Sequence, residues 1–400
     1  MYYEIPPTAG LAPQFQDLYD SPDLALNQKI AQLLNIPIPA LTCSGTVALI
    51  LSLEVLQQRC PHRNQVIIPA WTCPLVVLAV EKIGLVPVLC DLSLADYVMD
   101  EMQLVSLVNN NTLAIIVTHY AGLVYPFEQI QTLAKNVGCY IIEDAAQALG
   151  AQDKGQSVGL RGDIGFFSLA FGKGLTSAEG GLVFSRHSAL HQELHDKAQQ
   201  LPQLFLWELK RCFELIGYYL FYHPLSLTLL YGYPRRKSLD RHDEIAAVGD
   251  DFGPADIPIH QLGRWRSQVA ANAAERLPDY WQKLRQQAHQ RIAQLRQLSY
   301  LKVFCEAPHT QSNFPFLLII VYNSHLCKKI LNELWRSHLG VTKLFVHAIA
   351  DYPHLAHIKA VTPNAVQFAA SSFTISNSLW LDDEKFSMIL NVLKKYDLQD

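Results

Sequence analysis

"GCYIIED", residues 138–144, is a short run of β-branched and aromatic residues that ends in two carboxylates. Three earlier runs have the same character and also end in small or polar residues: QVIIPA (65–70), LVPVLCD (85–91) and LAIIVTH (113–119). Longer helical patterns separate these runs, and this is the spacing of βαβ units. Such strands lie in a parallel sheet that is buried on both faces. We therefore predict an α/β protein with a mostly parallel central sheet flanked by helices.

Polar side chains gather where the predicted strands end. Asp91, His119, Glu143 and Asp144 each close one of the runs. Because ligands of open α/β sheets bind outside the carboxyl ends of the strands, we expect the functional site at this edge. For His119 a structural hydrogen bond is the preferred interpretation.

The composition excludes several classes of function. Half of the 400 residues are hydrophobic, 17% are charged and the formal net charge is −4, so the chain can bury a large core but lacks the basic excess of a nucleic-acid binder. The eight cysteines form no C-x-x-C pair, so we predict reduced thiols and no metal site. The N-terminal MYYEIPPTAG has no signal-peptide pattern, and we expect a cytoplasmic protein.

The character of the sequence changes in its last third. A charged helical stretch at 276–298 is followed by the strand-like run FPFLLIIVY (314–322) and by two more helical patterns. This order predicts a smaller α/β domain attached through a long helix. We place the large domain at 1–260 and the small C-terminal domain at 261–400.

An apolar insertion at about 204–240 interrupts the large domain. It is dense in Leu, Phe and Tyr and contains the basic run PRRK, but its charges and Pro224 argue against a full membrane span. Two interpretations stay open. The insertion is a helical pair buried in a subunit interface, or it lies on a membrane as a peripheral element with Arg235, Arg236 and Lys237 facing anionic headgroups.

Two stretches have residues that suit the binding of an anion or of a heteroaromatic ring. Ser44, Gly45 and Thr46 precede an apolar helix, whose first-turn N–H groups form an anion site suited to phosphate; an ordinary capped helix is the alternative. In IIEDAAQALGA, Asp144 ends a strand and a helix carrying Gln147 is expected to follow. A buried carboxylate can hold a heteroaromatic nitrogen protonated; alternatively, it complements the helix dipole while Gln147 closes a capping box.

A lysine stands between two glycines in GDIGFFSLAFGKGLTSAEGG (162–181). The pattern predicts two strands joined by a loop, with Lys173 at a strand end and Ser168 five residues before it. Gly172 and Gly174 permit close approach to a ligand. Lys173 is then either a solvated loop residue or an amine that can form a Schiff base with an aldehyde.

The segments SGT, EDAAQALGA, GDIGFFS and a lysine followed by EGG, in this order and spacing, resemble the DegT/DnrJ/StrS family of sugar aminotransferases, which use pyridoxal 5'-phosphate (PLP). The resemblance covers about residues 40–185. It implies the aspartate aminotransferase fold (PLP fold type I), bound PLP and a homodimer with active sites at the subunit interface.

The resemblance also implies roles for single residues. Lys173 would hold PLP as a Schiff base and move the proton between substrate and cofactor. Asp144 would pair with the pyridine nitrogen, and Gln147 would approach the phenolic oxygen of the ring. The phosphate would bind Ser168 and the backbone of Gly45 and Thr46.

The sequence departs from the family pattern at two places. The family often has an aromatic residue stacked on PLP where this chain has Cys73, while Trp71 lies two residues earlier and shares its face if the segment is extended. Either residue is therefore a candidate to contact the ring. The family's asparagine and arginine pattern before the long helix is also absent, and Arg264 and Arg266 nearby have no assigned role.

The resemblance predicts transfer of an amino group, with glutamate as the expected donor, to the keto group of a nucleotide-linked deoxysugar for polysaccharide or secondary-metabolite synthesis. PLP and pyridoxamine phosphate would alternate. The alternatives are a PLP-dependent sugar dehydratase, which carries histidine in place of the lysine, and a non-catalytic PLP-binding regulator. A lipid-linked acceptor becomes conceivable if the apolar insertion touches a membrane. We expect no nucleic-acid partner.

Overall fold

The computed structural model describes residues 3–249 and 257–397. Its main sheet has seven strands in the order β1-β9-β8-β5-β4-β2-β3. The strands from β8 to β3 are parallel, and β9 pairs antiparallel with both β8 and β1. The bounds are β1 Ala40–Thr42, β2 Gln65–Pro69, β3 Val86–Cys90, β4 Thr112–Thr118, β5 Tyr140–Asp144, β8 Ile164–Ser168 and β9 Gly181–Phe184. The predicted α/β class with a mostly parallel central sheet is confirmed.

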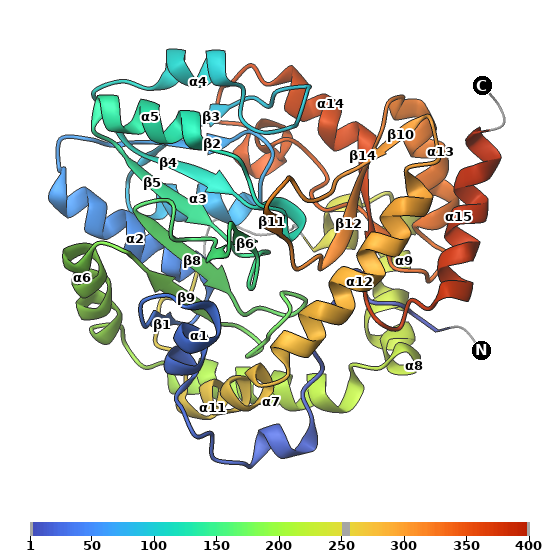
Figure 1. Ribbon diagram of the computed structural model, residues 1–400, viewed down its shortest axis with the longest axis horizontal. Helices are drawn as coiled ribbons and strands as arrows, with labels where there is room; N and C mark the ends of the chain where they lie inside the picture. The colour runs from blue at the N-terminus through green and yellow to red at the C-terminus, as the bar shows by residue number, and fades with distance from the viewer. Residues whose placement is uncertain (1–2, 250–256, 398–400) are drawn as a thin grey trace.

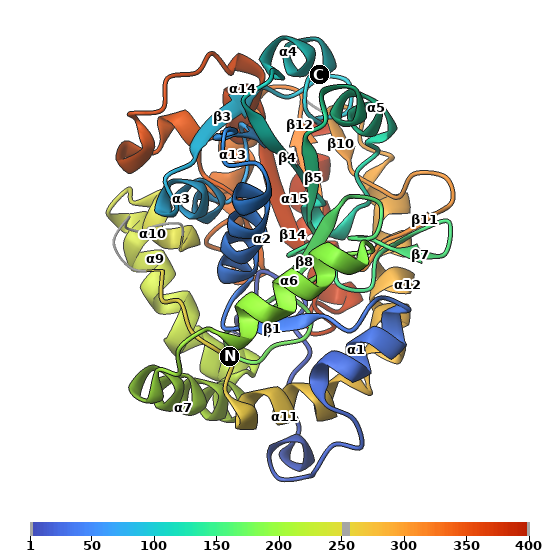
Figure 2. The same ribbon diagram turned by 90° about the vertical axis from the view of Figure 1, so that its left-hand side faces the viewer.

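Helices cover both faces of this sheet because successive strand residues point to opposite sides. In β4, Ala114 and Ile116 pack in the cluster that contains helices α2 and α3, whereas Ile115 and Val117 pack in the cluster that contains α4 and α5. Figure 2 shows α2 and α5 on opposite sides of β4 and β5. The bounds are α2 Gly45–Arg59, α3 Pro74–Lys82, α4 Glu101–Leu107, α5 Glu128–Val137 and α6 Ser188–Gln199.

A second, antiparallel sheet in the C-terminal part has the order β10-β12-β14-β13 (Figure 1). Its strands are β10 Leu301–Val303, β12 Phe316–Val321, β13 Val341–Thr342 and β14 Ser372–Ser376, and its helices are α13 Ser324–Leu334, α14 Pro363–Ser371 and α15 Asp383–Asp397. Helix α12 (Leu277–Leu295) leads to this sheet from α11 (Arg264–Ala274), which packs on α1 (Leu26–Leu34). A small third sheet joins β6 Gln152–Asp153, β7 Gln156–Ser157 and β11 Thr310–Gln311. The division into two domains at residue 260 stays a prediction.

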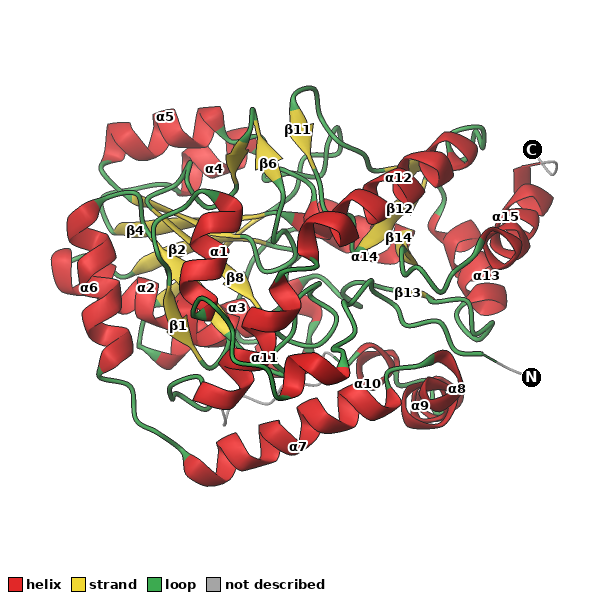
Figure 3. Ribbon diagram, turned by 60° about the horizontal axis from the view of Figure 1, so that its bottom comes forward, coloured by secondary structure: helices red, strands yellow, loops and turns green. Residues whose placement is uncertain are grey.

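The apolar insertion forms a row of helices along one side of the molecule (Figure 3). These are α7 Phe205–Phe221, α8 Pro224–Leu227, a π-helix at Thr228–Gly232 and α9 Tyr233–Asp240, and α10 Glu244–Val248 follows them. Leu215 is the one fully buried residue of α7. Several large apolar side chains of this helix are exposed at the surface. Among the helices of the described ranges, none has the length and apolar character needed to cross a bilayer.

The basic run of the insertion is held by an N-terminal carboxylate. Glu4 is completely buried, and its carboxylate contacts Arg235 at 2.8 Å and Arg236 at 2.6 Å, with His338 Nδ1 at 2.8 Å. Arg235 is itself buried. Of the two interpretations, the membrane-facing one does not hold for Arg235, which is buried against Glu4; Arg236 pairs with the same carboxylate but is partly exposed.

Replacement of Glu4 by glutamine should lower the free energy of unfolding by about 3–5 kcal/mol, because it leaves the buried Arg235 guanidinium without a counter-ion. Urea unfolding followed by circular dichroism measures this loss. The matched control is Asp240→Asn, which breaks the exposed Arg336–Asp240 pair and should cost about 1 kcal/mol at most. Equal losses in the two variants would contradict the structural role of Glu4.

Candidate active site

A cavity of about 740 Å³ lies at the carboxyl ends of the parallel strands and is lined by residues from both large sheets. Strands β5 and β8 contribute Asp144 and Ser168, and the C-terminal part contributes Phe316, Lys343 and Thr374. All seven residues predicted to bind a cofactor line this cavity: Gly45, Thr46, Cys73, Asp144, Gln147, Ser168 and Lys173. The structure thus brings together residues that are more than 120 positions apart in the sequence.

The first turn of α2 forms one wall of the cavity. Ser44 is the N-cap, and its hydroxyl accepts a hydrogen bond from Val47 N–H at 3.1 Å. A Cβ on Gly45 would lie 2.9 Å from Ser168 Cβ, so only glycine lets the Ser168 side chain approach this turn. The Ser168 hydroxyl and the free first-turn N–H groups therefore meet in one place, which suits an anion. The capping role of Ser44 and the anion site are compatible.

Asp144 occupies the last position of β5 at the floor of the cavity. Its carboxylate accepts a hydrogen bond from Ala146 N–H at 3.0 Å. Burial raises the pKa of Asp144, although this hydrogen bond and the nearby Lys173 and His119 oppose the rise. A cation or a charged N–H group placed beside this carboxylate would stabilise its ionised form.

The helix expected after Asp144 is absent. Residues 145–150 form successive turns, and Gly150 has a φ of +92°. A Cβ at Gly150 would lie 2.5 Å from the Trp281 ring, so α12 packs against this turn where a helix would have continued. Gln147 consequently closes no capping box. Its side-chain oxygen accepts a hydrogen bond from Ala121 N–H at 2.9 Å, which fixes the amide in the cavity wall.

Lys173 lies in the loop between β8 and β9, as the sequence predicts. Gly172 and Gly174 on either side have φ values of +77° and +86°, which favour glycine. The N-terminal segment packs on this loop, because a Cβ on Gly172 would lie 2.4 Å from Thr8 Oγ1 and Leu11 N–H donates to the Gly174 carbonyl at 2.7 Å. The lysine therefore lines the cavity on an anchored loop.

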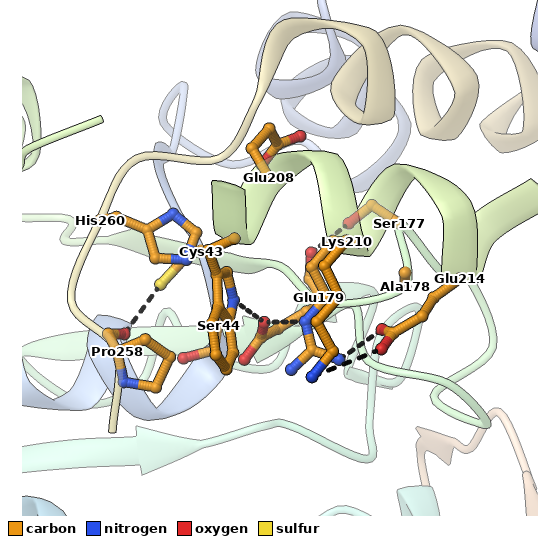
Figure 4. Close-up of polar contacts among 12 residues, drawn as sticks. Cys43, Ser44, Ser177, Ala178, Glu179, Glu208, Lys210, Glu214, Pro258 and His260 are labelled. Carbon is orange, nitrogen blue, oxygen red and sulfur yellow. Dashed lines mark hydrogen bonds and ion pairs between the residues drawn. The ribbon is translucent and has the colours of Figure 1, made fainter. Parts of the chain in front are cut away.

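Helix α7 of the insertion makes a hydrogen bond and an ion pair with Glu179 at the end of this loop (Figure 4). Trp207 Nε1 donates to the Glu179 carboxylate at 3.2 Å, and Arg211 lies 2.7 Å from the same group. Arg266 pairs with Glu208 of α7 and donates to the Ser177 carbonyl at 2.7 Å. The sequence left Arg266 unassigned; the structure gives it this structural role. Arg264 instead lines a separate cavity beside Glu208.

His119 and Glu143 form a buried hydrogen-bonded pair behind the cavity floor. Tyr125 N–H donates to His119 Nδ1 at 2.9 Å, so the ring proton of a neutral His119 is on Nε2, which lies 3.0 Å from Glu143 Oε2. The structural hydrogen bond expected for His119 is confirmed.

Backbone N–H groups complete the surroundings of the Glu143 carboxylate. Gly159, Arg161 and Gly162 donate to it at 2.8, 2.7 and 2.5 Å. Burial on its own raises the pKa of Glu143, but the hydrogen bonds from His119 and from this backbone outweigh burial and lower the pKa below its ordinary value of 4.5. Glu143 is therefore an ionised structural group.

The two candidates for contact with a bound ring have different surroundings. Trp71 is fully buried and packs edge-on against Phe345 and Phe368, with ring centroids 4.9 and 4.5 Å away. Cys73 lines the cavity beside Thr72 at the start of α3. Trp71 thus supports the cavity from the core, and Cys73 is the candidate that reaches it.

Sequence reasoning missed the cavity residues from the insertion and from the C-terminal part. Lys343 of the segment after β13 lines the cavity and pairs with Glu244 of α10 at 3.2 Å. Glu179 and Arg211 line it on the side of α7. Trp207 and Arg211 are four positions apart, so they share one face of α7. This spacing was the sequence signal that could have predicted a face of α7 with hydrogen-bond donors.

Replacement of Glu143 by glutamine should lower the free energy of unfolding at pH 7 by about 3 kcal/mol, because an amide cannot replace all of these accepted hydrogen bonds. Since the folded pKa of Glu143 is depressed, the advantage of the natural protein is complete above about pH 4.5 and shrinks as the pH falls through the folded pKa. Urea unfolding between pH 7 and pH 3 measures both effects.

The matched control is Glu128→Gln, which alters the exposed partner of Arg161 and should cost less than about 1 kcal/mol. A loss in the Glu143 variant that is no larger than in this control, or that does not narrow in acid, would contradict the buried ion network.

Comparison with known proteins finds similarity to sugar aminotransferases. Residues 22–201 match the model of the DegT/DnrJ/EryC1/StrS aminotransferase family. GDP-perosamine synthase of Escherichia coli O157:H7 is 36% identical over 40% of this chain and 43% of its own length. UDP-N-acetyl-3-dehydro-alpha-D-glucosamine 3-aminotransferase of Acidithiobacillus ferrooxidans is 36% identical over 42% of this chain and 46% of its own length. The chain thus matches less than half the length of these relatives.

Solved structures resemble the fold over nearly the whole chain. A DegT DnrJ EryC1 StrS aminotransferase from Brucella abortus superposes with a TM-score of 0.69 at 17% identity, over 93% of this chain and 89% of the other. A protein assigned as a sugar aminotransferase from Streptococcus pneumoniae, solved in PLP and PMP forms, gives a TM-score of 0.75 at 18% identity for the PMP form, over 99% and 98% of the two chains. The fold is therefore that of the PLP fold type I aminotransferases, and the resemblance to the DegT/DnrJ/EryC1/StrS aminotransferase family is confirmed over residues 22–201.

Proposed function

We propose that this protein is a PLP-dependent aminotransferase that transfers an amino group to the keto group of a sugar. The observation that carries the proposal is that Lys173, Asp144 and the anion site formed by Ser168 and the first turn of α2 line one cavity. These are an amine, a carboxylate and a phosphate site, and PLP has a reactive group for each of them.

Three features of the cavity fit PLP. The close approach of Ser168 to Gly45 leaves a hydroxyl and free N–H groups for a phosphate. Asp144, whose pKa is raised by burial, gains from a protonated ring nitrogen beside it. Cys73, beside the start of α3, offers a small sulfur for contact with the ring.

Bound PLP supplies an electron sink for the carbon that loses a proton. Lys173 would hold the PLP aldehyde through Nζ, and the same amine would accept and return a proton at Nζ. Asp144 would hold the ring nitrogen protonated. Gln147, anchored by Ala121 N–H, lies in the cavity wall where it can meet the phenolic oxygen. The α2 turn and Ser168 would hold the phosphate.

The acceptor class follows from the names of the relatives. GDP-perosamine synthase and the UDP-linked 3-aminotransferase support a nucleotide-linked keto sugar as acceptor. Glutamate is the donor in this proposal. Lys173 itself weighs against the dehydratase alternative, in which histidine replaces the lysine. A homodimer in the cytoplasm, with the cavity near the subunit interface, is part of the same proposal.

Addition of glutamate to the PLP-loaded protein should convert the visible absorption of lysine-bound PLP into that of pyridoxamine phosphate. Lys173→Ala should abolish the lysine-bound band and slow the conversion by at least about 100-fold, because it removes the proton carrier. The control Lys135→Ala changes an exposed lysine on α5 and should leave both unchanged. Normal conversion in Lys173→Ala would overturn the proposal, and a lysine-bound band that no amino donor converts would favour the regulator.

A further inference from the structure

A second cavity of about 630 Å³ adjoins the one that contains Lys173. Both cavities are lined by Pro7, Thr8, Phe171 and Tyr231. Gly172, which immediately precedes Lys173, also lines the second cavity. The two spaces therefore adjoin at the loop that carries the reactive amine. We call the second space the apolar groove.

The walls of the apolar groove are hydrophobic and aromatic. Besides the shared residues, α7 and the helices after it supply Tyr218, Phe221, Tyr222, Leu227 and Leu230. Glu214 is the single charged residue among the described residues that line it, and Arg211 neutralises its carboxylate. Such a lining offers burial to hydrocarbon and no counter-ion to a free phosphate or carboxylate.

The groove opens where the insertion exposes large apolar side chains. Leu230 is 60% exposed at its rim, and Leu229 beside it is 73% exposed. Further exposed side chains of the same helices are Leu209, Phe213, Ile216, Leu220, Phe221 and Leu225. Several large apolar side chains exposed on neighbouring helices mark a binding site. The groove thus lies between these helices and the loop that carries the reactive amine.

We propose that the apolar groove binds an alkyl or isoprenoid chain of the keto substrate while the keto carbon lies at Lys173. The inference rests on the proposed function, the amination of a keto sugar, and assigns its acceptor an alkyl or isoprenoid chain in place of the nucleotide. The four lining residues that the groove shares with the Lys173 cavity favour this occupant over a second copy of the protein, because the chain of a substrate held at Lys173 would lie beside them. The exposed leucines then shield the part of the chain that leaves the groove.

Gly217 provides a precise way to block the groove. It lines the groove, and a Cβ built on it has no atom within 4 Å. A tryptophan at this position extends into the open space without displacing a neighbour of the new Cβ. Gly217→Ala leaves the groove open, and Leu206→Trp places the same indole side chain at a 79% exposed position of α7 that does not line the groove.

The test labels the full chain, freed of PLP, with decanal or butanal in the presence of cyanoborohydride. Lysine Nζ condenses with the aldehyde carbon and water leaves, after which hydride from cyanoborohydride reduces the imine to a stable secondary amine. Peptide mass spectrometry gives the extent of labelling at Lys173, normalised to the exposed Lys135 in the same sample. Decanal should label Lys173 at least about tenfold more than butanal, because its longer chain gains apolar burial.

Gly217→Trp, and independently Leu230→Asp at the rim, should reduce decanal labelling of Lys173 to the butanal level. Gly217→Ala and Leu206→Trp should keep the preference within about twofold of the natural protein. Absence of a chain-length preference, or a preference that survives both blocking variants, overturns the proposal. Loss of dimerisation in Leu230→Asp without any chain-length preference would assign the surface to a second copy and also overturn it. Labelling needs no transamination, so a failure of the glutamate conversion is distinguished from a failure of the groove.

Discussion

The carboxylate of Glu143 fixes the relative positions of the elements that carry the candidate site. It accepts hydrogen bonds from the backbone of residues 159–162, which lead into β8, and it contacts His119 at the end of β4. Successive residues of a strand point to opposite faces, so anchoring Glu143 on one side turns Asp144 toward the cavity. Because β8 leads directly to Ser168 and the Lys173 loop, the same anchor helps to position the hydroxyl and the amine.

Much of this arrangement follows from local patterns in the sequence. The apolar runs ending in Asp91, His119 and Asp144 predicted parallel strands, and the strands occur there as β3, β4 and β5. Strand ends then predicted which side chains would meet at the cavity. The turn after Asp144 was missed because its cause, the Trp281 ring packed on Gly150, comes from a helix far along the chain.

The insertion shows where sequence patterns give too little information. Its composition predicted apolar helices but not the polar face on which Trp207, Glu208 and Arg211 hold the Lys173 loop through Glu179 and Arg266. Nor could the composition predict that Glu4, near the start of the chain, would neutralise Arg235 of the insertion. Both interactions join residues that are distant in sequence: α7 packs on the loop that ends at Glu179, and α9 packs on the N-terminal segment. The insertion thereby shapes the Lys173 cavity on one side and forms the apolar groove on the other.

The most direct test of the central claim is to locate PLP on the chain. The protein is incubated with PLP and reduced with borohydride, which makes the linkage to lysine permanent, and the modified peptides are identified by mass spectrometry. The account predicts stoichiometric modification of Lys173. Inorganic phosphate should reduce this modification, because it competes for the anion site at the first turn of α2. Modification spread over exposed lysines such as Lys135, with Lys173 unmodified, would contradict it.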